Sequence, residues 1–285
     1  MKIGINLLLW TGHVTDEYVP ILQAIKDTGF DGVEIPVFDA SDVSHYAKLG
    51  AIMDDIGLQR TAVALIPDEA HSPLSDNAAH RQAAVDHLNR VIDCCSAMGA
   101  EMLVGPYYQP LGIFSGEFPS ETELSRVADV HRRIVPVARG AGIGMAFEPL
   151  NRFEAHLLNT IEQSIAYTNR LGEAGFGVLY DTFHANIEEK DPLAALHAVH
   201  AAGALSHIHI SENDRGTPGK GHAKIRETIV AAKALGYDGW LTIEAFGRAV
   251  PELAAATRVW RDFFPNPEDV YTEGYRYIRE IWDDA

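Results

Sequence analysis

Seven times along this chain, a helix-like segment ends in a glycine, and an apolar, β-prone run follows within one or two residues. Glycine adopts the left-handed conformation that ends a helix without strain, so each of these glycines predicts the end of a helix. Together with an opening strand expected over Lys2–Leu9, the pattern predicts eight βα units. The seven junctions are Gly29, Gly57, Gly99, Gly142, Gly175, Gly203 and Gly236.

Eight successive βα units can form either a closed (β/α)₈ TIM barrel or an open doubly wound sheet. The 285 residues suit a barrel, which typically needs about 250, and no glycine-rich dinucleotide fingerprint follows the first strand. We therefore expect one α/β TIM-barrel domain over residues 1–285. An extra C-terminal helix is expected after Asn266-Pro267, with apolar residues at helical spacing. They are Tyr271, Tyr275, Ile278 and Trp282.

The overall charge of the chain excludes some classes of binding partner. The chain has 23 Lys and Arg against 40 Asp and Glu, a formal net charge of −17. Nucleic acids and anionic membranes select basic surfaces, so neither is an expected partner. No run approaches the roughly 20 apolar residues of a membrane span, and no secretory signal is recognisable. Cys94 and Cys95 are adjacent in a predicted helix and suggest neither a disulfide nor a metal site, so we expect a cytoplasmic protein.

Polar residues close four successive apolar runs at matching distances. Glu148, Asp181 and His209 each lie six residues after the glycine that precedes their run. Glu244 lies eight residues after its glycine, and Asp238-Gly239 supplies the two extra residues as a turn. Because parallel strands end at one edge of a barrel, these four side chains are expected at the same level. That edge is where TIM-barrel enzymes build their active sites.

Three carboxylates and one imidazole form a ligand set for a divalent cation. Oxygen-rich ligation with a single nitrogen suits Mn²⁺, and also Mg²⁺ or Co²⁺, better than a structural zinc. Without a cation, three carboxylates at one level would repel one another strongly. The alternative is that each residue merely ends its strand and is satisfied by a neighbouring helix N-terminus. Four consecutive strands with related spacing favour the metal site.

The roles of further residues expected at the same edge can be interpreted in more than one way. His184 lies past the end of its strand, where it is better placed to touch a substrate than a metal. Glu154 and Arg215 are charged loop residues that could bind substrate or pair with each other on the surface. Glu34 could be a substrate contact or a polar residue that bonds a backbone amide. His207 points to the same side as His209 and either fills the interior or supports that ligand.

Two long loops, residues 66–76 and 106–120, are expected to extend over the site, where loops usually carry specificity. The second contains Tyr107 and Tyr108, which could pack against the apolar face of a ligand or against each other. The sequence does not determine the conformation of either loop.

Four motifs, taken in order, resemble those of the ketose 3-epimerases. That family includes the D-tagatose, D-allulose (psicose) and L-ribulose 3-epimerases and lies within the xylose-isomerase-like barrels. The likeness is specific as an ordered set over residues 148–246, although Ala185 and Ala245 stand where the family often has Met and Pro. The motifs are Glu148-Pro-Leu-Asn-Arg-Phe-Glu154, Asp181-Thr-Phe-His184, His207-Ile-His209 with Arg215, and Ile243-Glu244-Ala-Phe246.

The resemblance implies an isomerase that epimerises free ketoses at C3. It implies that Glu148, Asp181, His209 and Glu244 bind the metal, and that Glu148 and Glu244 also exchange protons. Deprotonation and reprotonation at C3 would pass through an enediolate stabilised by the cation, because inversion needs an acid and a base on opposite faces. Glu154, His184 and Arg215 would hold the O1 to O3 end of the sugar. Family members suggest a homodimer or homotetramer.

Other functions remain open from sequence alone. On the same scaffold, the chain could be an aldose–ketose isomerase, or a dehydratase of sugar acids or inososes. It could also bind a sugar or a metal without catalysis. A nuclease of the endonuclease IV type is disfavoured by the acidic charge.

Overall fold

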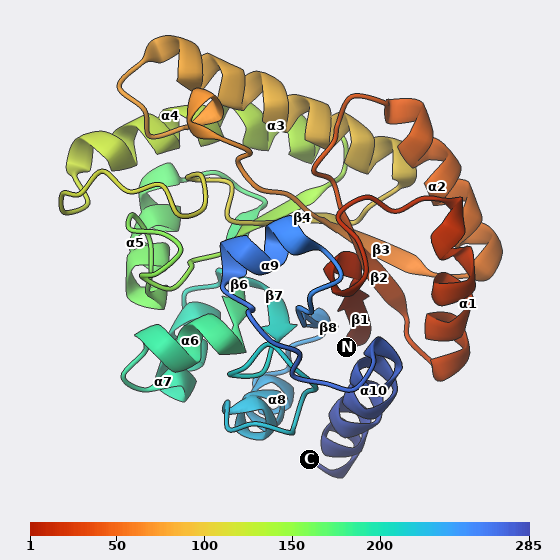
Figure 1. The fold of residues 1–285 in the computed structure, drawn as a ribbon. Coiled ribbons are helices and arrows are strands. Elements are labelled where there is room, and N and C mark those ends of the chain that lie inside the picture. The colour runs from red at the N-terminus through yellow and green to blue at the C-terminus, as the bar shows by residue number, and fades with distance from the viewer.

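The computed structural model describes all 285 residues, which form a closed barrel of eight parallel strands (Figure 1). The strands follow one another around the barrel in chain order, and β8 pairs with β1 to close it. The prediction of a TIM barrel is confirmed. The strands are β1 (Lys2–Asn6), β2 (Gly32–Pro36), β3 (Gln59–Val63), β4 (Met102–Gly105), β5 (Gly144–Phe147), β6 (Phe176–Asp181), β7 (Leu205–Ile210) and β8 (Trp240–Ile243).

Helices surround the sheet and return the chain to the start of each next strand (Figure 1). All seven predicted junction glycines have positive φ, between 67° and 116°, as left-handed helix ends require. The outer helices are α1 (Val19–Thr28), α2 (Val43–Ile56), α3 (Ala78–Met98), α4 (Glu121–Gly140), α5 (Ile161–Leu171), α7 (Pro192–Ala201) and α8 (Ile225–Ala234). Short helices follow β6 and β8, namely α6 (Thr182–Glu188) and α9 (Pro251–Thr257).

The predicted C-terminal helix is α10 (Pro267–Asp284), which packs against α8 and α1. The side chain of Asn266 accepts a hydrogen bond from the backbone N–H of Asp269 at 2.9 Å, and Pro267 occupies the first turn. Val270 and Ile278 of this helix are fully buried. The helix therefore completes the outer layer where β8 meets β1.

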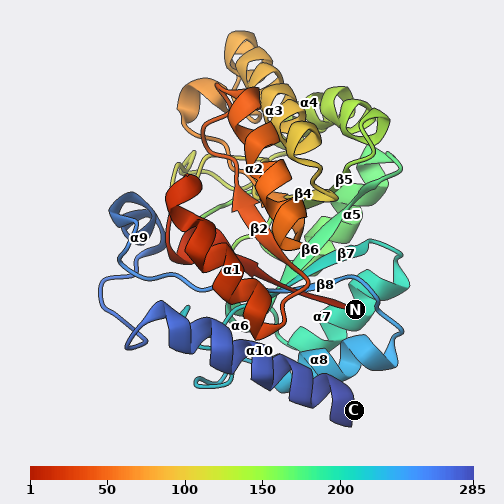
Figure 2. The ribbon, with the colours of Figure 1, turned by 90° about the vertical axis from the view of Figure 1, so that its right-hand side faces the viewer.

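The core has two parts. One cluster of 68 buried residues fills the space between the sheet and the outer helices. A second cluster of eight buried residues lies at the carboxyl end of the barrel and includes Leu8, Phe246 and, from α9, Ala254. Figure 2 shows α9 at one end of the barrel and both termini toward the other. Because α9 packs on this second cluster, it covers the carboxyl end of the strands.

The opening strand is shorter than predicted. It ends at Asn6, and Leu7–Leu9 form a 3₁₀ turn rather than strand. The side chain of Asn6 caps this turn by accepting a hydrogen bond from the backbone N–H of Leu8 at 2.9 Å. Two further 3₁₀ turns are Asp16–Tyr18 and Glu69–His71. None of the helices is long and apolar enough to cross a bilayer.

Candidate active site

The structure brings the four predicted strand-end residues together inside the carboxyl end of the barrel. Glu148 follows β5, Asp181 ends β6, His209 lies in β7 and Glu244 follows β8. One oxygen or nitrogen atom from each lies within 4.8 Å of the others. His209 Nδ1 lies 3.4 Å from Glu244 Oε1, 3.7 Å from Asp181 Oδ2 and 4.0 Å from Glu148 Oε1. No residue of the four exposes more than 4% of its surface.

Burial and mutual charge shift the pKa values of this group. Burial raises the pKa of Glu148 to about 7, with a further contribution from the charge of Glu244, while His184 opposes the shift. Burial also acts to raise the pKa of Asp181, but His209 and Arg215 outweigh it and hold that pKa below its usual range. Burial disfavours the charged form of His209, yet neighbouring carboxylates raise its pKa well above the usual value.

The donor set fits a divalent cation. Two of its buried atoms, Glu148 Oε1 and His209 Nδ1, have no hydrogen-bond partner, although buried polar atoms are almost always paired. Both atoms belong to the group of four. Three carboxylates with a single imidazole match the oxygen-rich ligation of Mn²⁺ or Mg²⁺. A cation among these side chains would satisfy the two unpaired atoms and neutralise the acidic charge.

His184 lies beside this group, and its proton can be assigned from its contacts. The backbone N–H of Asn151 donates to Nδ1 at 3.0 Å, which leaves the proton of a neutral ring on Nε2, although Nη2 of Arg215, itself only a donor, lies 3.1 Å from Nε2. Nε2 faces Glu148 Oε1 at 3.4 Å. Burial would lower the pKa of His184, but the contact with Glu148 outweighs burial and raises it. His184 can therefore donate a hydrogen toward the pocket.

Arg215 reaches the site from the loop after β7. Its Nη1 donates to Glu244 Oε2 at 2.7 Å and to Ser211 Oγ at 2.9 Å. The guanidinium lies between two aromatic rings, 3.7 Å from the centroid of Phe183 and 4.7 Å from that of Phe246. Stacking and hydrogen bonding together fix the plane of the guanidinium.

The backbone around Arg215 is strained and is held by a buried carboxylate. Arg215 has φ 63°, one of only two residues other than glycine with positive φ. Its N–H donates to the carbonyl oxygen of Glu212 at 2.9 Å. The carboxylate of Glu212, 1% exposed, accepts from the backbone N–H groups of Gly219 at 2.9 Å and Ala223 at 2.8 Å. Strain maintained in this way at a cleft is typical of a functional residue.

Glu154 is also buried, with 7% of its surface exposed, and accepts a hydrogen bond from Asn151 Nδ2 at 2.8 Å. Its carboxylate makes no ion pair with Arg215, which pairs with Glu244 and Asp181 instead. The alternative of a surface ion pair between Glu154 and Arg215 is therefore wrong. Both side chains instead line the same pocket.

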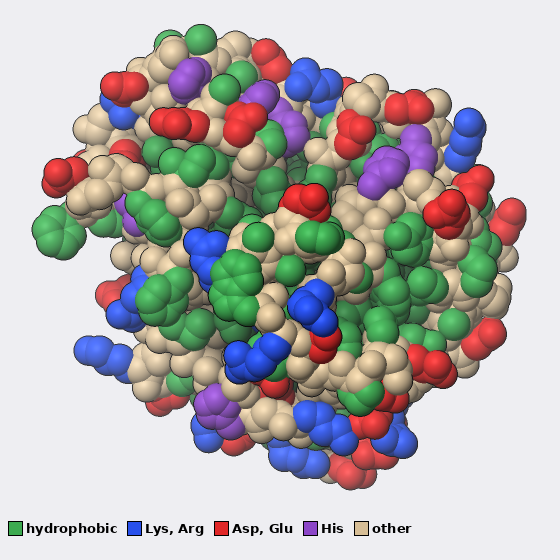
Figure 3. Space-filling model, viewed as in Figure 1, with side chains coloured by type: hydrophobic (Ala, Val, Ile, Leu, Met, Phe, Trp, Pro, Cys, Tyr) green, Lys and Arg blue, Asp and Glu red, His purple; other side chains and the backbone are tan.

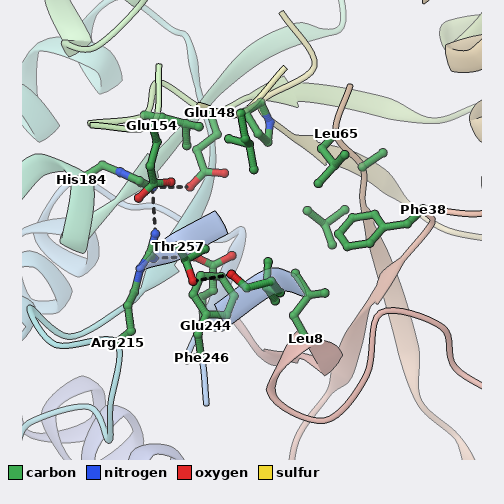
Figure 4. A pocket seen from close by; sticks show the side chains of 16 residues that line it. Leu8, Phe38, Leu65, Glu148, Glu154, His184, Arg215, Glu244, Phe246 and Thr257 are labelled. Atoms are coloured by element: carbon green, nitrogen blue, oxygen red, sulfur yellow. Dashed lines mark hydrogen bonds and ion pairs between the residues drawn. The ribbon is translucent and has the colours of Figure 1, made fainter. Parts of the chain in front are cut away.

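The empty volume of that pocket is about 410 Å³, part of it open to solvent, and the pocket has two unlike sides (Figure 4). Charged side chains, including Glu148, His184 and Arg215, gather on one side, and Leu8, Phe38 and Leu65 lie on the other. A compact molecule with polar groups at one end and carbon surface at the other would match both sides.

Two segments after the strands cover the pocket. Leu253 and Thr257 of α9 contribute to its lining, as do Pro106 and Leu111 from the loop after β4. In the view of Figure 3 this covered end faces the reader, and hydrophobic side chains are exposed on it. Loop 106–120 therefore contributes as expected. Of loop 66–76, no residue lines the pocket, although Leu65 just before it does.

Tyr107 and Tyr108 are not ligand contacts. Both are fully buried outside the pocket lining. Tyr107 packs edge-on against His131, with ring centroids 5.6 Å apart, and Tyr108 packs similarly against Phe147 at 6.2 Å. They pack against these core rings instead of against each other, so neither alternative predicted for them is correct.

Glu34 has a role that neither sequence interpretation included. It lies inside the barrel, fully buried, and bonds side chains rather than a backbone amide or the pocket. Its Oε1 lies 2.9 Å from His209 Nε2, 175 residues away in sequence. The distance along the chain explains why no local motif revealed this pair.

Comparison with known proteins gives one consistent result. Residues 22–281 match the family model described as xylose isomerase-like TIM barrel. The chain is 30% identical to a probable ketose 3-epimerase of Synechocystis sp., over 99% of this chain and 97% of the relative. It is 31% identical to a ketose 3-epimerase of Arthrobacter globiformis, over 98% and 96% of the two chains.

Solved structures agree with these matches. A structure of L-ribulose 3-epimerase superposes with a TM-score of 0.92 at 28% identity and covers 99% of this chain and 95% of its own. A D-allulose 3-epimerase from Methylomonas sp., crystallised with D-allulose, superposes with a TM-score of 0.90 at 25% identity, over 98% and 96% of the two chains.

Proposed function

The chain belongs to the ketose 3-epimerases of the xylose isomerase-like TIM barrel family, and from that premise we propose that it inverts C3 of a free ketose. The proposed substrates are of the D-tagatose, D-fructose/D-allulose and L-ribulose class. One observation carries the proposal: the carboxylates of Glu148 and Glu244, which directly follow β5 and β8, lie close together and line the same pocket.

Two carboxylates are what inversion at C3 requires. The hydrogen on C3 of a ketose is weakly acidic because the carbonyl at C2 is adjacent. One glutamate removes that proton, and the other delivers a proton to the opposite face of the carbon. The two residues exchange roles in the reverse reaction. A single base would return the proton to the face from which it came, and the configuration would not change.

We propose that Glu148, Asp181, His209 and Glu244 hold a divalent cation, most suitably Mn²⁺, with Mg²⁺ or Co²⁺ as substitutes. When bound, the cation supplies the positive charge that makes removal of the C3 proton favourable. The unpaired Glu148 Oε1 and His209 Nδ1 support this assignment.

The remaining charged residues of the pocket are proposed to orient the sugar. Arg215 and the Nε2–H of His184 can donate hydrogen bonds to the oxygens at the C1 to C3 end, and Glu154 can accept one from a hydroxyl group. Leu8, Phe38 and Leu65 then face the rest of the carbon chain. A sugar held in this way would have C3 beside the two glutamates.

The decisive experiment is product analysis. The purified protein, loaded with Mn²⁺, is incubated in D₂O with D-fructose, D-tagatose or L-ribulose, and the products are identified by chromatography and NMR. The C3 epimer carrying deuterium at C3 is expected. An aldose product would instead identify an aldose–ketose isomerase, and loss of water would identify a dehydratase. Binding without deuterium incorporation would identify a non-catalytic protein.

We propose further that the protein forms a homodimer or homotetramer. Large apolar side chains are exposed, with Phe118 at 91% and Phe153 and Trp260 at 65% each, and exposed aromatic surface favours association. Light scattering coupled to size-exclusion chromatography measures the mass directly, and the mass of a single 31.2 kDa chain would contradict the proposal.

A further inference from the structure

A layer of polar side chains lies inside the barrel directly beneath the candidate active site. The residues of this layer come from five strands, and each exposes at most 1% of its surface. A barrel interior is usually filled by branched apolar side chains, so a buried polar layer is unusual. The members are Asn6 of β1, Glu34 of β2, Thr61 of β3, His207 of β7 and Thr242 of β8.

The carboxylate of Glu34 is the centre of this layer. Its Oε1 lies 2.9 Å from Asn6 Nδ2 and 2.9 Å from His209 Nε2. Its Oε2 lies 2.9 Å from Thr61 Oγ1 and 3.3 Å from His207 Nε2. A carboxylate only accepts hydrogen bonds, so Asn6, Thr61 and His209 must be the donors. Glu34 is therefore fully paired even though it is completely buried.

A second cation does not fit here. Glu34, His207 and His209 also offer atoms within 4.8 Å of one another. However, the contacts of Glu34 with Asn6, Thr61 and His209 already occupy its oxygens, and Nε2 of His207 lies 3.0 Å from Thr242 Oγ1. The carboxylate of Glu34 is thus fully engaged in hydrogen bonds, although His207 Nδ1 in the same layer has no partner, and the layer contacts the site above it through His209 and Asn6.

The contact through His209 determines where its proton lies. Because Nε2 donates to Glu34, the lone pair available for a cation is on Nδ1, the atom that faces Glu148, Asp181 and Glu244. A carboxylate behind a ligating histidine fixes its tautomer and ring orientation and makes it a stronger ligand. Asn6 also links Glu34 to the site, since its Nδ2 lies 2.9 Å from Glu34 Oε1 and 3.3 Å from Glu244 Oε1.

We propose that Glu34 is a positioning residue that holds His209 with its Nδ1 lone pair toward the site and thereby sets the affinity of the protein for its divalent cation. The inference rests on the cation site of the proposed function. It does not depend on which sugar is the substrate. Glu34 touches neither substrate nor cation and acts through His209.

The test compares two substitutions at the same carboxylate. Glu34→Gln keeps the shape but removes the charge that faces His209 Nε2. Thr61→Val is nearly isosteric and removes a hydrogen bond from the other oxygen, Oε2, which does not face His209. Affinity for Mn²⁺ is measured by isothermal titration calorimetry without substrate, and folding is checked by circular dichroism. Glu34→Gln should weaken binding by about 10- to 100-fold, and Thr61→Val by no more than a few-fold.

Equal affinity in Glu34→Gln and the parent protein would overturn the inference, and so would an equal loss in both variants, since that would mark a general packing effect. A measurement on the unsubstituted protein adds a test that no folding defect can affect. In the Mg²⁺-loaded, ¹⁵N-labelled protein, with the His209 signal identified from a His209→Asn spectrum, the ring proton should be on Nε2. A proton on Nδ1 would overturn the inference.

These readouts separate the inference from the proposed function. A parent protein that binds Mn²⁺ but converts no ketose contradicts the function and leaves the role of Glu34 testable. A parent protein that epimerises ketoses and whose Glu34→Gln variant binds Mn²⁺ normally contradicts the inference alone.

Discussion

Arg215 Nη1 lies 2.7 Å from Glu244 Oε2, and neither residue exposes more than 4% of its surface. The pair joins the guanidinium of Arg215, a proposed sugar-binding group, to the carboxylate of Glu244, a proposed acid–base group. Because both are buried, removing either partner would leave an uncompensated charge. Arg215 is therefore proposed to contact the sugar and also to set the position of the carboxylate proposed to exchange the proton.

Arg215→Lys should reduce kcat/KM by about 10- to 100-fold. Lysine keeps the charge but loses the planar fork and the stacking between Phe183 and Phe246, interactions worth roughly 1–3 kcal/mol. Steady-state kinetics with the best ketose measures the effect. Arg152→Lys is the matched control, since the Arg152 side chain is 61% exposed where it pairs with Glu188, and it should leave kcat/KM unchanged. A similar loss in both variants would contradict the assignment.

Glu148→Gln and Glu244→Gln should each lower turnover by about 10³-fold or more, since each removes an acid–base group and a cation ligand. Deuterium incorporation at C3 in D₂O should be lost in parallel. Glu101→Gln is the control, because Glu101 precedes β4 at the far end of the barrel and pairs with Lys2. Substantial turnover in either of the first two variants would count against the mechanism.

Removal of the cation should abolish activity and lower thermal stability. After treatment with EDTA, the buried carboxylates lose the charge that neutralises them. Restoring a cation at 100-fold above its dissociation constant should add about 2.7 kcal/mol of stability, or roughly 5 to 10 °C in Tm. Differential scanning fluorimetry with Mn²⁺, Mg²⁺ and Co²⁺ provides the measurement. Full activity after exhaustive chelation would exclude the proposed metal site.

The free energy of unfolding should fall as pH drops from about 6.5 toward 4, partly because of His131. Burial lowers the pKa of this fully buried histidine to about 4. Within this window the unfolded chain binds a proton that the folded protein excludes. The contribution is therefore present above pH 6.5 and is lost on acidification, by roughly 3 kcal/mol.

The comparison with His131→Gln isolates this effect from that of the carboxylates. Glutamine can keep neutral hydrogen bonds to the hydroxyl of Tyr167 and the carbonyl of Tyr107 without titrating. Denaturant unfolding at pH 4.5 and 7 should show a smaller loss of stability for the variant. Identical losses in both proteins would show that His131 contributes no pH dependence.

The sequence predicted the features of this fold that depend on local order. Glycine junctions and polar strand ends recur at regular spacing, so the eight strands and the meeting of Glu148 with Glu244 could be predicted without coordinates. The N-cap of α10 at Asn266 could also be predicted from the sequence. Each of these predictions came from a local pattern: Glu148 and Glu244 are distant in the chain, but they occupy equivalent positions in a repeated βα unit, and the barrel brings equivalent positions together.

Features that depend on distant contacts could not be predicted. Leu7–Leu9 are buried whether they form strand or 3₁₀ turn, so their hydrophobicity does not distinguish the two. Tyr107 resembles a ligand-binding aromatic until the ring of His131 is known to pack on it. The contact of Glu34 with His209 exists only because the barrel brings β2 and β7 to the same interior.

The pairing of β8 with β1, at Gly4 and Thr242, joins the last strand made to the first. Glu244 lies just beyond that seam, so a growing polypeptide on the ribosome presents the other three ligands before the fourth exists. The proposed cation site is therefore complete only after β8 has been made and paired with β1, so binding of an ion by all four residues would report that the strand closing the barrel is in place.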